Sequence, residues 1–371
     1  MTKSVPFVAL NRQYDVFKNE IDEAFFRVAK SGAYVMGSDV EQFEKELAHI
    51  CNTKYAIAVA NGTDALILSL KSLGIGQGDE VITAPNSFIA SAGAIAAVGA
   101  TPRFCDIAYN HNLDPQKLEN VITEKTKAIM PIHLTGRPAP MNKINEIAKK
   151  HGLFVIEDAA QAIGAKYKNR PVGSLGDMGC FSLHPLKNLF VMGDGGFITL
   201  SDDNHYEIIK HLQNHGLISR NEAVKWGMNS RLDTLNAAIG SIKLKNLPKL
   251  TIRFREIAKR YQDGLKDIVE VPIDTKDEYA VYHNFVICTD YRDELQEYLK
   301  NRNIGCAVHY PIPLHLQKAA KDLGYKEGDF PITEKLNKQQ LSLPIFPELR
   351  EDEIDTVINT IQEFFKEKQG T

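Results

Sequence analysis

A single lysine stands inside an apolar stretch, FSLHPLKNLFVMGDGG at residues 181–196. Lys187 has hydrophobic and small neighbours, and a glycine-rich turn follows it. A buried amine is costly unless it is paired or neutral, so a pocket would lower its pKa and make it a nucleophile able to form a Schiff base. A stem packed on apolar surface with its head in water is the simpler interpretation of Lys187 taken alone.

A carboxylate is expected at the end of an apolar strand. Asp158 closes the apolar part of LFVIEDAA (153–160), and Gln161 follows three residues later. The carboxyl ends of buried parallel strands are where open α/β sheets bind their ligands, so Asp158 is a candidate for an acid that faces an active-site crevice. A helix cap or a loop turn would use an aspartate here equally well.

A turn that suits an anion lies earlier in the chain. Gly62 and Thr63 connect the apolar run YAIAVA (55–60) to a helical pattern. Backbone N–H groups at a helix start bind anions, and the helix dipole assists. Gly62 permits close approach, Thr63 supplies a hydroxyl, and Ser182 offers a second one. A strand, a turn and a capping threonine are common, so this feature carries little weight by itself.

Taken together, these features match the requirements of pyridoxal 5′-phosphate. The phosphate needs a helix start, the aldehyde needs a lysine, and the ring nitrogen needs a carboxylate that keeps it protonated. The turn at 61–63, Lys187 and Asp158 supply these three groups. The sequence therefore predicts one site that holds this cofactor.

The pattern of elements predicts how these residues are brought together. Short apolar runs alternate with helical segments as far as residue 200, which predicts a mostly parallel sheet with helices on both faces. A long helical stretch at 230–267, expected to be interrupted near Pro248, leads into a second unit. The strands are expected at 55–60, 80–85, 101–107, 126–134 and 153–160.

The composition argues against several other classes of protein. The chain has 371 residues, of which 43% are hydrophobic, and its net charge of −3 suggests neither a nucleic-acid partner nor a basic membrane surface. No apolar run approaches the roughly 18 residues of a membrane helix. The five scattered cysteines, with no C-x-x-C pair, favour reduced thiols in the cytoplasm. No metal is expected, because the histidines lack ligand spacing; His211 and His215 lie four apart without a third ligand.

Several segments resemble one family of enzymes over nearly the whole chain. The segments are EDAAQAIGA, FSLHPLKNL with GDGG, NGTDAL, PIHLTGRPAPM and MNSRLDTLNAAIG. They resemble the DegT/DnrJ/EryC1/StrS aminotransferases, which are pyridoxal phosphate enzymes of fold type I acting mainly on nucleotide-linked sugars. The resemblance implies an α/β fold, with a mostly parallel, seven-stranded-type sheet in a large cofactor domain (1–245, including the N-terminal segment). A smaller α+β domain (246–371) is expected to follow.

The resemblance also implies roles around the cofactor ring. Lys187 would form the Schiff base, Asp158 would pair with the pyridinium nitrogen, and Gln161 would contact the phenolic side. Phe88, in PNSFIAS, would supply an aromatic face. Without the resemblance, Phe88 is more simply a core aromatic.

The phosphate contacts implied by the resemblance involve two subunits. Gly62, Thr63 and Ser182 would hold the phosphate, together with Asn229 of the neighbouring subunit. The working unit would then be a homodimer with its sites at the interface. From the residues alone, Asn229 could be a helix cap and Arg231 part of a surface ion pair.

The implied reaction moves an amino group from an amino acid, glutamate, to a keto or aldehyde sugar carried by a nucleotide. Lys187 would take the proton from Cα of the donor and return it to C4′ of the cofactor. The segment KNL and the motif GDGG resemble the branch that acts on 3-keto sugars, and the product would enter amino-sugar pathways such as lipopolysaccharide or O-antigen synthesis. Candidate substrate contacts are Tyr34, His184, His309, Tyr310 and His315, although the prolines near His309 could simply shape a loop.

The chain also departs from the family pattern. Leu183 stands where the family often has a second phenylalanine, and Asn236 stands where glutamine is common. A related branch replaces the lysine by histidine and becomes a sugar dehydratase, so the presence of Lys187 favours transamination. A pyridoxal phosphate dehydratase or lyase, and a non-catalytic regulatory member of the fold, remain the alternatives.

Overall fold

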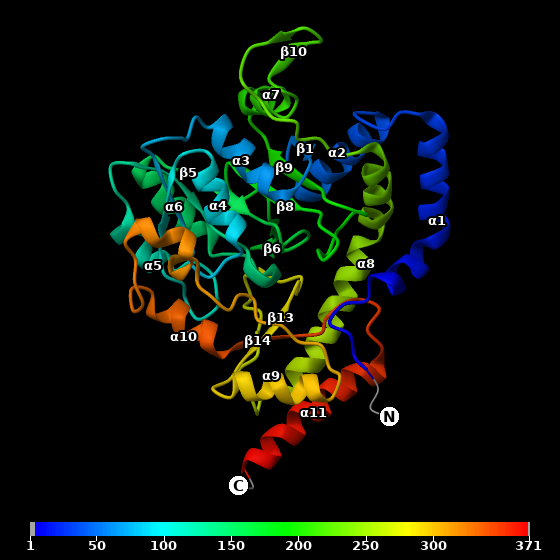
Figure 1. Cartoon of the computed structure of the whole chain (residues 1–371), viewed down its shortest axis with the longest axis vertical. Helices are drawn as coiled ribbons and strands as arrows, with labels where there is room; N and C mark the ends of the chain where they lie inside the picture. Colours follow the sequence, from blue (N-terminus) through cyan, green and yellow to red (C-terminus); the bar gives the residue numbers. More distant parts are fainter. Residues whose placement is uncertain (1–3, 370–371) are drawn as a thin grey trace.

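A computed structural model describes residues 4–369, and its centre is a seven-stranded sheet (Figure 1). Strand β9 runs antiparallel to both of its neighbours, β1 and β8, and the other pairs are parallel. The expected mostly parallel sheet is thereby confirmed. Its strands are, in spatial order, β1 (Tyr55–Val59), β9 (Gly196–Leu200), β8 (Met178–Ser182), β5 (Phe154–Asp158), β4 (Thr126–Met130), β2 (Glu80–Thr83) and β3 (Thr101–Phe104).

Helices cover both faces of this sheet because its strands are apolar on both sides. In β1, Ala56 and Ala58 enter one core while Ile57 and Val59 enter another. Each face thus buries every second residue of a strand. The covering helices are α2 (Ser38–Cys51), α3 (Gly62–Ser72), α4 (Ile89–Ala97), α5 (Pro115–Leu118), α6 (Met141–His151) and α7 (Asp203–Leu212).

A second, smaller unit has its own core, with Tyr261 and Phe285 among its fully buried residues. The predicted boundary at 245/246 falls inside α8 (Thr234–Leu265), which contributes to both cores. Val5 and Ala9 also pack in the second core, whereas the predicted division assigns the N-terminal segment to the first. The remaining elements of this unit are β13 (Phe285–Cys288), α9 (Arg292–Asn301), α10 (Pro331–Gln339), β14 (Gln340–Leu343) and α11 (Glu351–Gln369).

Two local predictions are wrong. Helix α8 continues through Pro248 without interruption, since Leu244 and Leu247 are buried before it and Thr251 and Phe254 after it. Packing on both sides outweighs the one backbone hydrogen bond that proline cannot make. The amphipathic run SDVEQFEKELAHICN predicts Ser38 as the cap of its helix, but in α2 the cap position is occupied by Gly37, and no side chain caps the helix.

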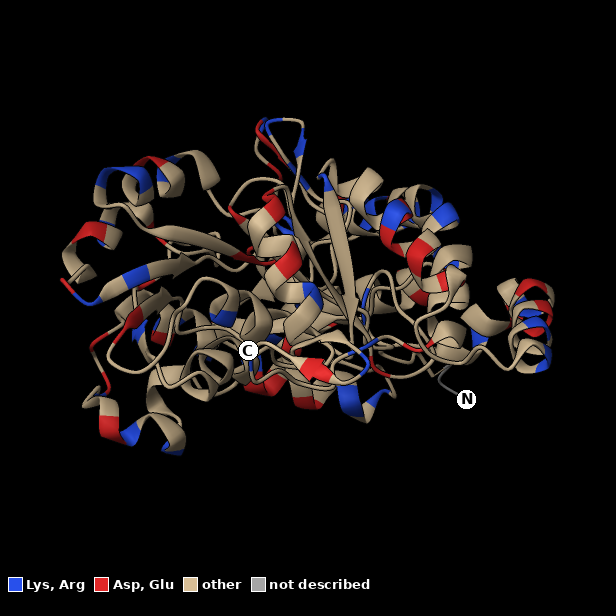
Figure 2. Ribbon diagram, turned by 90° about the horizontal axis from the view of Figure 1, so that it is seen from above, with Lys and Arg blue, Asp and Glu red and all other residues tan. Residues whose placement is uncertain are grey.

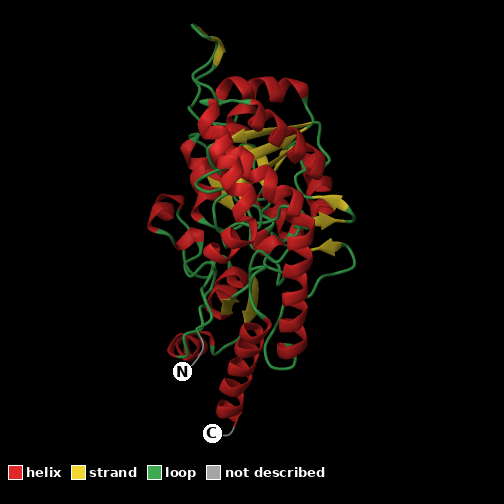
Figure 3. Ribbon diagram, turned by 90° about the vertical axis from the view of Figure 1, so that its right-hand side faces the viewer, coloured by secondary structure: helices red, strands yellow, loops and turns green. Residues whose placement is uncertain are grey.

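A hairpin extends from the body of the molecule. The hairpin of β10 (Leu217–Ser219) and β11 (Glu222–Ala223) projects at the top of Figure 1 and again in the side view of Figure 3. Trp226, just after it, is 94% exposed.

Helix α1 (Leu10–Ser31) packs along α8. A small ribbon is formed by β6 (Lys166–Tyr167), β7 (Arg170–Pro171) and β12 (Glu278–Tyr279).

Charged residues of both signs are scattered over the outer helices and loops (Figure 2). Within residues 4–369, none of the helices combines the length and apolarity needed to cross a membrane.

Candidate active site

The ends of three strands meet at one edge of the sheet. Gly196 at the start of β9 pairs with Val59 on one side and with Ser182 on the other. A Cβ on Gly196 would lie 2.5 Å from the carbonyl carbon and oxygen of Asn61. Glycine is therefore required for the turn after β1 to pass this closely over β9.

The start of α3 lies directly against Ser182. The Asn61 side chain accepts a hydrogen bond from the Asp64 N–H at 2.8 Å and so caps the helix. A Cβ on Gly62 would lie 2.9 Å from Cβ of Ser182. Gly62, Thr63 and Ser182 are thus gathered at a helix N-terminus, and this cradle suits a phosphate.

Asp158 is held at the carboxyl end of β5 with only 6% of its surface exposed. Its Oδ2 accepts a hydrogen bond from Ser91 Oγ at 2.7 Å, and Ser91 Oγ lies 2.8 Å from Ser87 Oγ. The Ala160 N–H approaches Oδ1 at 3.3 Å. This buried, oriented carboxylate suits a protonated ring nitrogen as its partner.

Gln161 and two aromatic side chains surround the neighbouring space. Gln161 Oε1 accepts from the Thr135 N–H at 2.7 Å, and its Nε2 donates to the Tyr310 hydroxyl at 3.2 Å. The Phe88 ring lies 5.6 Å from that of Tyr310, measured between centroids, and is 53% exposed. Phe88 is therefore not a core residue, and its face is available to a ligand.

Lys187 lies in the loop between β8 and β9 and is half-buried. Its N–H donates to the His184 carbonyl at 2.8 Å, which shapes the loop. Desolvation lowers the pKa of its amine from 10.5 to about 8, and the charge of Asp158 opposes this shift. A lowered pKa is what a nucleophilic amine needs at neutral pH.

Two histidines lie in the field of this lysine, and a tyrosine lies in the field of Asp158. Burial, followed by the Lys187 charge, lowers the pKa of His309 to about 4. The same causes, with His309 added, place the pKa of His283 well below its usual value. Burial, followed by the Asp158 charge, raises the pKa of Tyr310 to about 12. At neutral pH these three side chains are uncharged donors and acceptors.

His283 and Asn188 are not among the site residues that the sequence predicts. His283 Nδ1 donates to Asn188 Oδ1 at 3.1 Å, and Asn188 Nδ2 donates to the Val281 carbonyl at 3.0 Å. These bonds tie the loop that carries Lys187 to the segment before β13. No motif surrounds His283, and the apolar pattern of VYHNFVICT predicts only a strand.

The other predicted substrate residues occupy varied positions. Tyr34 is exposed and donates to the Ala29 carbonyl at 3.1 Å, and His184 is also exposed. His309 Nδ1 is hydrogen-bonded to Ser342 Oγ at 2.9 Å. His315 is buried, with its Nε2 3.1 Å from Glu334 Oε1, which favours a structural role. Contact with substrate stays a prediction for all of them.

Asn229 is exposed and does not cap a helix, because α8 begins five residues later behind Asp233. Arg231 Nη1 donates to Asn214 Oδ1 at 3.1 Å. The hydroxyl of the neighbouring Ser230 accepts from the Ala60 N–H at 3.2 Å. The neighbour of Asn229 thus contacts the residue just before the turn at 61–63, and the service of Asn229 to a second subunit stays a prediction.

The donor set fits pyridoxal phosphate. The glycine cradle at the start of α3, the oriented carboxylate of Asp158 and the amine of Lys187 all lie at the carboxyl edge of one sheet. Among the described residues, no group of three histidine, cysteine, aspartate or glutamate side chains is placed to hold a metal ion.

Comparisons with known proteins identify the family. A model described as the DegT/DnrJ/EryC1/StrS aminotransferase family matches residues 15–362. A dTDP-3-amino-3,6-dideoxy-alpha-D-galactopyranose transaminase of Aneurinibacillus thermoaerophilus is 44% identical over 97% of this chain and 99% of its own. A Geobacillus stearothermophilus protein named pleiotropic regulatory protein is 43% identical over 98% of this chain and 99% of its own.

A solved structure agrees with this assignment. NtdA from Bacillus subtilis, with bound cofactor PMP, superposes with a TM-score of 0.93 at 32% identity, covering 99% of this chain and 86% of that one. The expected fold, family and cofactor are confirmed. The chain belongs to the DegT/DnrJ/EryC1/StrS family and is a pyridoxal phosphate-dependent aminotransferase.

Proposed function

We propose that this aminotransferase moves the amino group of glutamate to C3 of a nucleotide-linked keto sugar. The observation that carries the proposal is the desolvated amine of Lys187, with its pKa near 8, in the field of Asp158. The choice of C3 is supported by the Aneurinibacillus relative, whose name specifies a 3-amino sugar. The motif GDGG at residues 193–196 supports it as well.

The bound cofactor supplies an electron sink that stabilises negative charge at Cα of the amino donor. Asp158 keeps the ring nitrogen protonated, and Ser91 holds the carboxylate in place for this. The amine of Lys187 would hold the cofactor and would be the base that accepts the Cα proton of the amino donor. An amine with a pKa near 8 can both take and return a proton at neutral pH.

Uncharged groups beside Lys187 suit a sugar acceptor. His309 and His283 are neutral because burial and the Lys187 charge disfavour their protonation. Neutral imidazoles and the Tyr310 hydroxyl can bind sugar hydroxyls without raising the positive charge near the lysine. Such a site can orient the carbonyl of the sugar for the reaction.

Two copies of the chain are proposed to form the working unit. Tyr34, Val35 and Met36 are large apolar residues exposed next to each other, and Trp226 stands almost free in solvent. Exposed apolar groups of this size are typical of protein interfaces. A cytoplasmic location and a product used for lipopolysaccharide or O-antigen are part of the proposal and rest on the family's chemistry.

The experiment is a substrate panel with the cofactor-loaded protein and glutamate. The acceptors are dTDP- and UDP-linked 3-keto and 4-keto hexoses, and the readout is 2-oxoglutarate. We expect 2-oxoglutarate to be released with the 3-keto sugars and not with the 4-keto sugars. The reverse preference contradicts C3, and keto-sugar turnover without 2-oxoglutarate points to a dehydratase or lyase. No turnover with any acceptor favours a regulator, the role named for the Geobacillus relative.

A further inference from the structure

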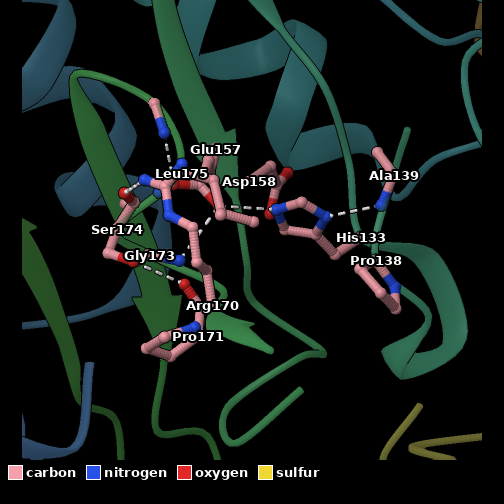
Figure 4. Close-up of polar contacts among 12 residues, drawn as sticks. His133, Pro138, Ala139, Glu157, Asp158, Arg170, Pro171, Gly173, Ser174 and Leu175 are labelled. Atoms are coloured by element: carbon pink, nitrogen blue, oxygen red, sulfur yellow. Dashed lines mark hydrogen bonds and ion pairs between the residues drawn. The ribbon is translucent and has the colours of Figure 1, made fainter. Parts of the chain in front are cut away.

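A buried histidine–glutamate pair lies directly behind the residues assigned to the cofactor ring. His133 Nε2 and Glu157 Oε2 are 2.9 Å apart, and both side chains are fully buried. Figure 4 shows His133 between Glu157 and the backbone of Ala139. The roles proposed for Asp158 and Gln161 do not involve this pair. Burying such groups costs free energy unless their interactions compensate for the lost water.

The hydrogen bonds define how the pair is protonated. His133 Nδ1 accepts from the Ala139 N–H at 2.9 Å, so it carries no proton. The proton of the neutral imidazole is therefore on Nε2, which donates to Glu157. Three backbone N–H groups also donate to Glu157, those of Gly173 at 2.9 Å, Leu175 at 2.7 Å and Gly176 at 2.8 Å. Four donors on two oxygens suit a carboxylate that is ionised.

The pair connects to the cofactor residues through two short backbone routes. Glu157 immediately precedes Asp158, and the side chains of successive strand residues point to opposite faces. The Asp158 carbonyl accepts from the His133 N–H at 3.0 Å, while the Asp158 N–H donates to Pro131 at 2.9 Å. The backbone that bears Asp158 is thus fixed to the backbone that bears His133.

The second route leads to Gln161. His133 begins the turn at 133–136, in which the Gly136 N–H donates to the His133 carbonyl at 3.3 Å. The Thr135 N–H in this turn donates to Gln161 Oε1 at 2.7 Å. A Cβ on Gly136 would lie 2.9 Å from the backbone nitrogen of His283, so the turn also packs against the segment before β13.

We propose that His133 and Glu157 are positioning residues that hold Asp158 and Gln161 in register for the two sides of the cofactor ring. The inference rests on the assignment of these two residues to the ring. Loss of the pair should let the 133–136 turn and the end of β5 shift relative to each other. Cofactor affinity and the electronic state of the ring then change, in addition to any loss of stability.

Two variants break the pair at different points. In His133→Asn, the side-chain oxygen can still accept from Ala139, but the bond to Glu157 is lost. In Glu157→Gln, the shape is kept, but the amide nitrogen cannot accept a backbone N–H. The control is Glu353→Gln in the second core, where a fully buried carboxylate accepts from Arg12 at 2.8 Å through both oxygens.

The first readout is the dissociation constant of pyridoxamine phosphate, measured by calorimetry. The second is the pH midpoint of the absorbance change of the bound pyridoxal phosphate. We expect both pair variants to bind pyridoxamine phosphate about tenfold more weakly, by analogy with the loss of outer partners at metal sites. The midpoint moves to higher pH, because a ring nitrogen with a misplaced carboxylate withdraws fewer electrons.

The control separates positioning from a general loss of stability. Glu353→Gln is expected to lower the thermal midpoint while leaving the dissociation constant and the pH midpoint as in the wild type. A wild-type constant and midpoint in His133→Asn would overturn the proposal, as would an equal change in Glu353→Gln. Failure of the wild-type protein to bind pyridoxamine phosphate would instead contradict the ring assignment itself.

Hydrogen exchange on the wild-type protein keeps the proposal testable if the variants do not fold. The amides of Gly173, Leu175 and Gly176 donate to Glu157 and belong to none of the residues assigned to the cofactor. If the pair couples them to the site, pyridoxamine phosphate slows their exchange. Unchanged exchange, with protection confined to the start of α3 and the Lys187 loop, would overturn the proposal.

Discussion

At Lys187 the reactivity of the amine is gained at the expense of the stability of the fold. The pocket that lowers the pKa of this amine to about 8 disfavours its charged form. In the unfolded chain the amine is charged up to about its usual pKa of 10.5. Below pH 8 the folded, cofactor-free protein must therefore hold a poorly solvated charge, and it loses stability for the sake of a reactive base.

Replacing Lys187 by methionine should stabilise the cofactor-free protein below pH 8. The cost of the charge is constant below the folded pKa and disappears as the pH rises from about 8 to 10.5. The gain at pH 6 is at most about 3 kcal/mol, and it shrinks toward zero over this pH window. Urea unfolding of both proteins from pH 6 to 10.5 measures it. A pH-independent difference would show that desolvation does not act on this amine.

A single methyl group at Gly62 should damage the phosphate cradle. In Gly62→Ala the new Cβ would lie 2.9 Å from Ser182 Cβ, so the start of α3 must move away from β8. The dissociation constant of pyridoxamine phosphate is expected to rise about tenfold, or 1.4 kcal/mol. Gly93→Ala is the matched control, because nothing lies within 4 Å of its Cβ in α4. Equal affinity in both variants would refute the cradle.

At the scale of elements, strand ends were easier to predict than the loops between them. The apolar runs at 55–60 and 153–160 correspond to β1 and β5, and both end at the site. His283, Asn188 and His133 lie in loops, and Glu157 lies on β5 next to Asp158; their contacts join segments far apart in the chain. Hydrophobic periodicity predicts which residues of one helix or strand are buried. It does not predict which loop packs against that helix or strand.

The continuity of α8 shows tertiary packing overriding a local signal. Pro248 lowers helix propensity, yet the helix passes through it between two buried stretches. Pro248→Ala restores the N–H that can donate to the carbonyl of Leu244. The thermal midpoint should rise by about 2–4 °C, because alanine in a helix is favoured over proline even after the unfolded chain gains freedom.

Differential scanning calorimetry measures this change, with Lys245→Ala at an exposed neighbouring position as control. An unchanged or lower midpoint in Pro248→Ala alone would mean that the helix is bent at this point to a degree that alanine does not relieve.

At the scale of the whole molecule, the sites are proposed to need two copies of the chain. No pattern in one chain reveals a contact with another, so the resemblance alone supplied the role of Asn229. The structure leaves Asn229 exposed, in an isolated β-bridge with Asn214. That exposure suits a residue that serves a second subunit, while the contact of Ser230 with Ala60 would also suit its own site.

Complementation between two inactive variants distinguishes these arrangements. Coexpressed Lys187→Ala and Asn229→Asp chains should form mixed dimers in which one site has both an intact lysine and an intact asparagine. With random pairing, half of the dimers are mixed and half of their sites are active, so about a quarter of the wild-type activity returns. If Asn229 serves its own chain, no mixed site is complete and activity stays at the level of the separate variants.

The central claim is that one amine, that of Lys187, carries the cofactor. Reduction of the loaded protein with borohydride fixes the cofactor to its lysine, and peptide mass mapping then locates it. The account predicts one labelled peptide, containing Lys187, and no label in Lys187→Ala. A label on another lysine, or none on a protein that shows the cofactor's absorbance, would contradict it.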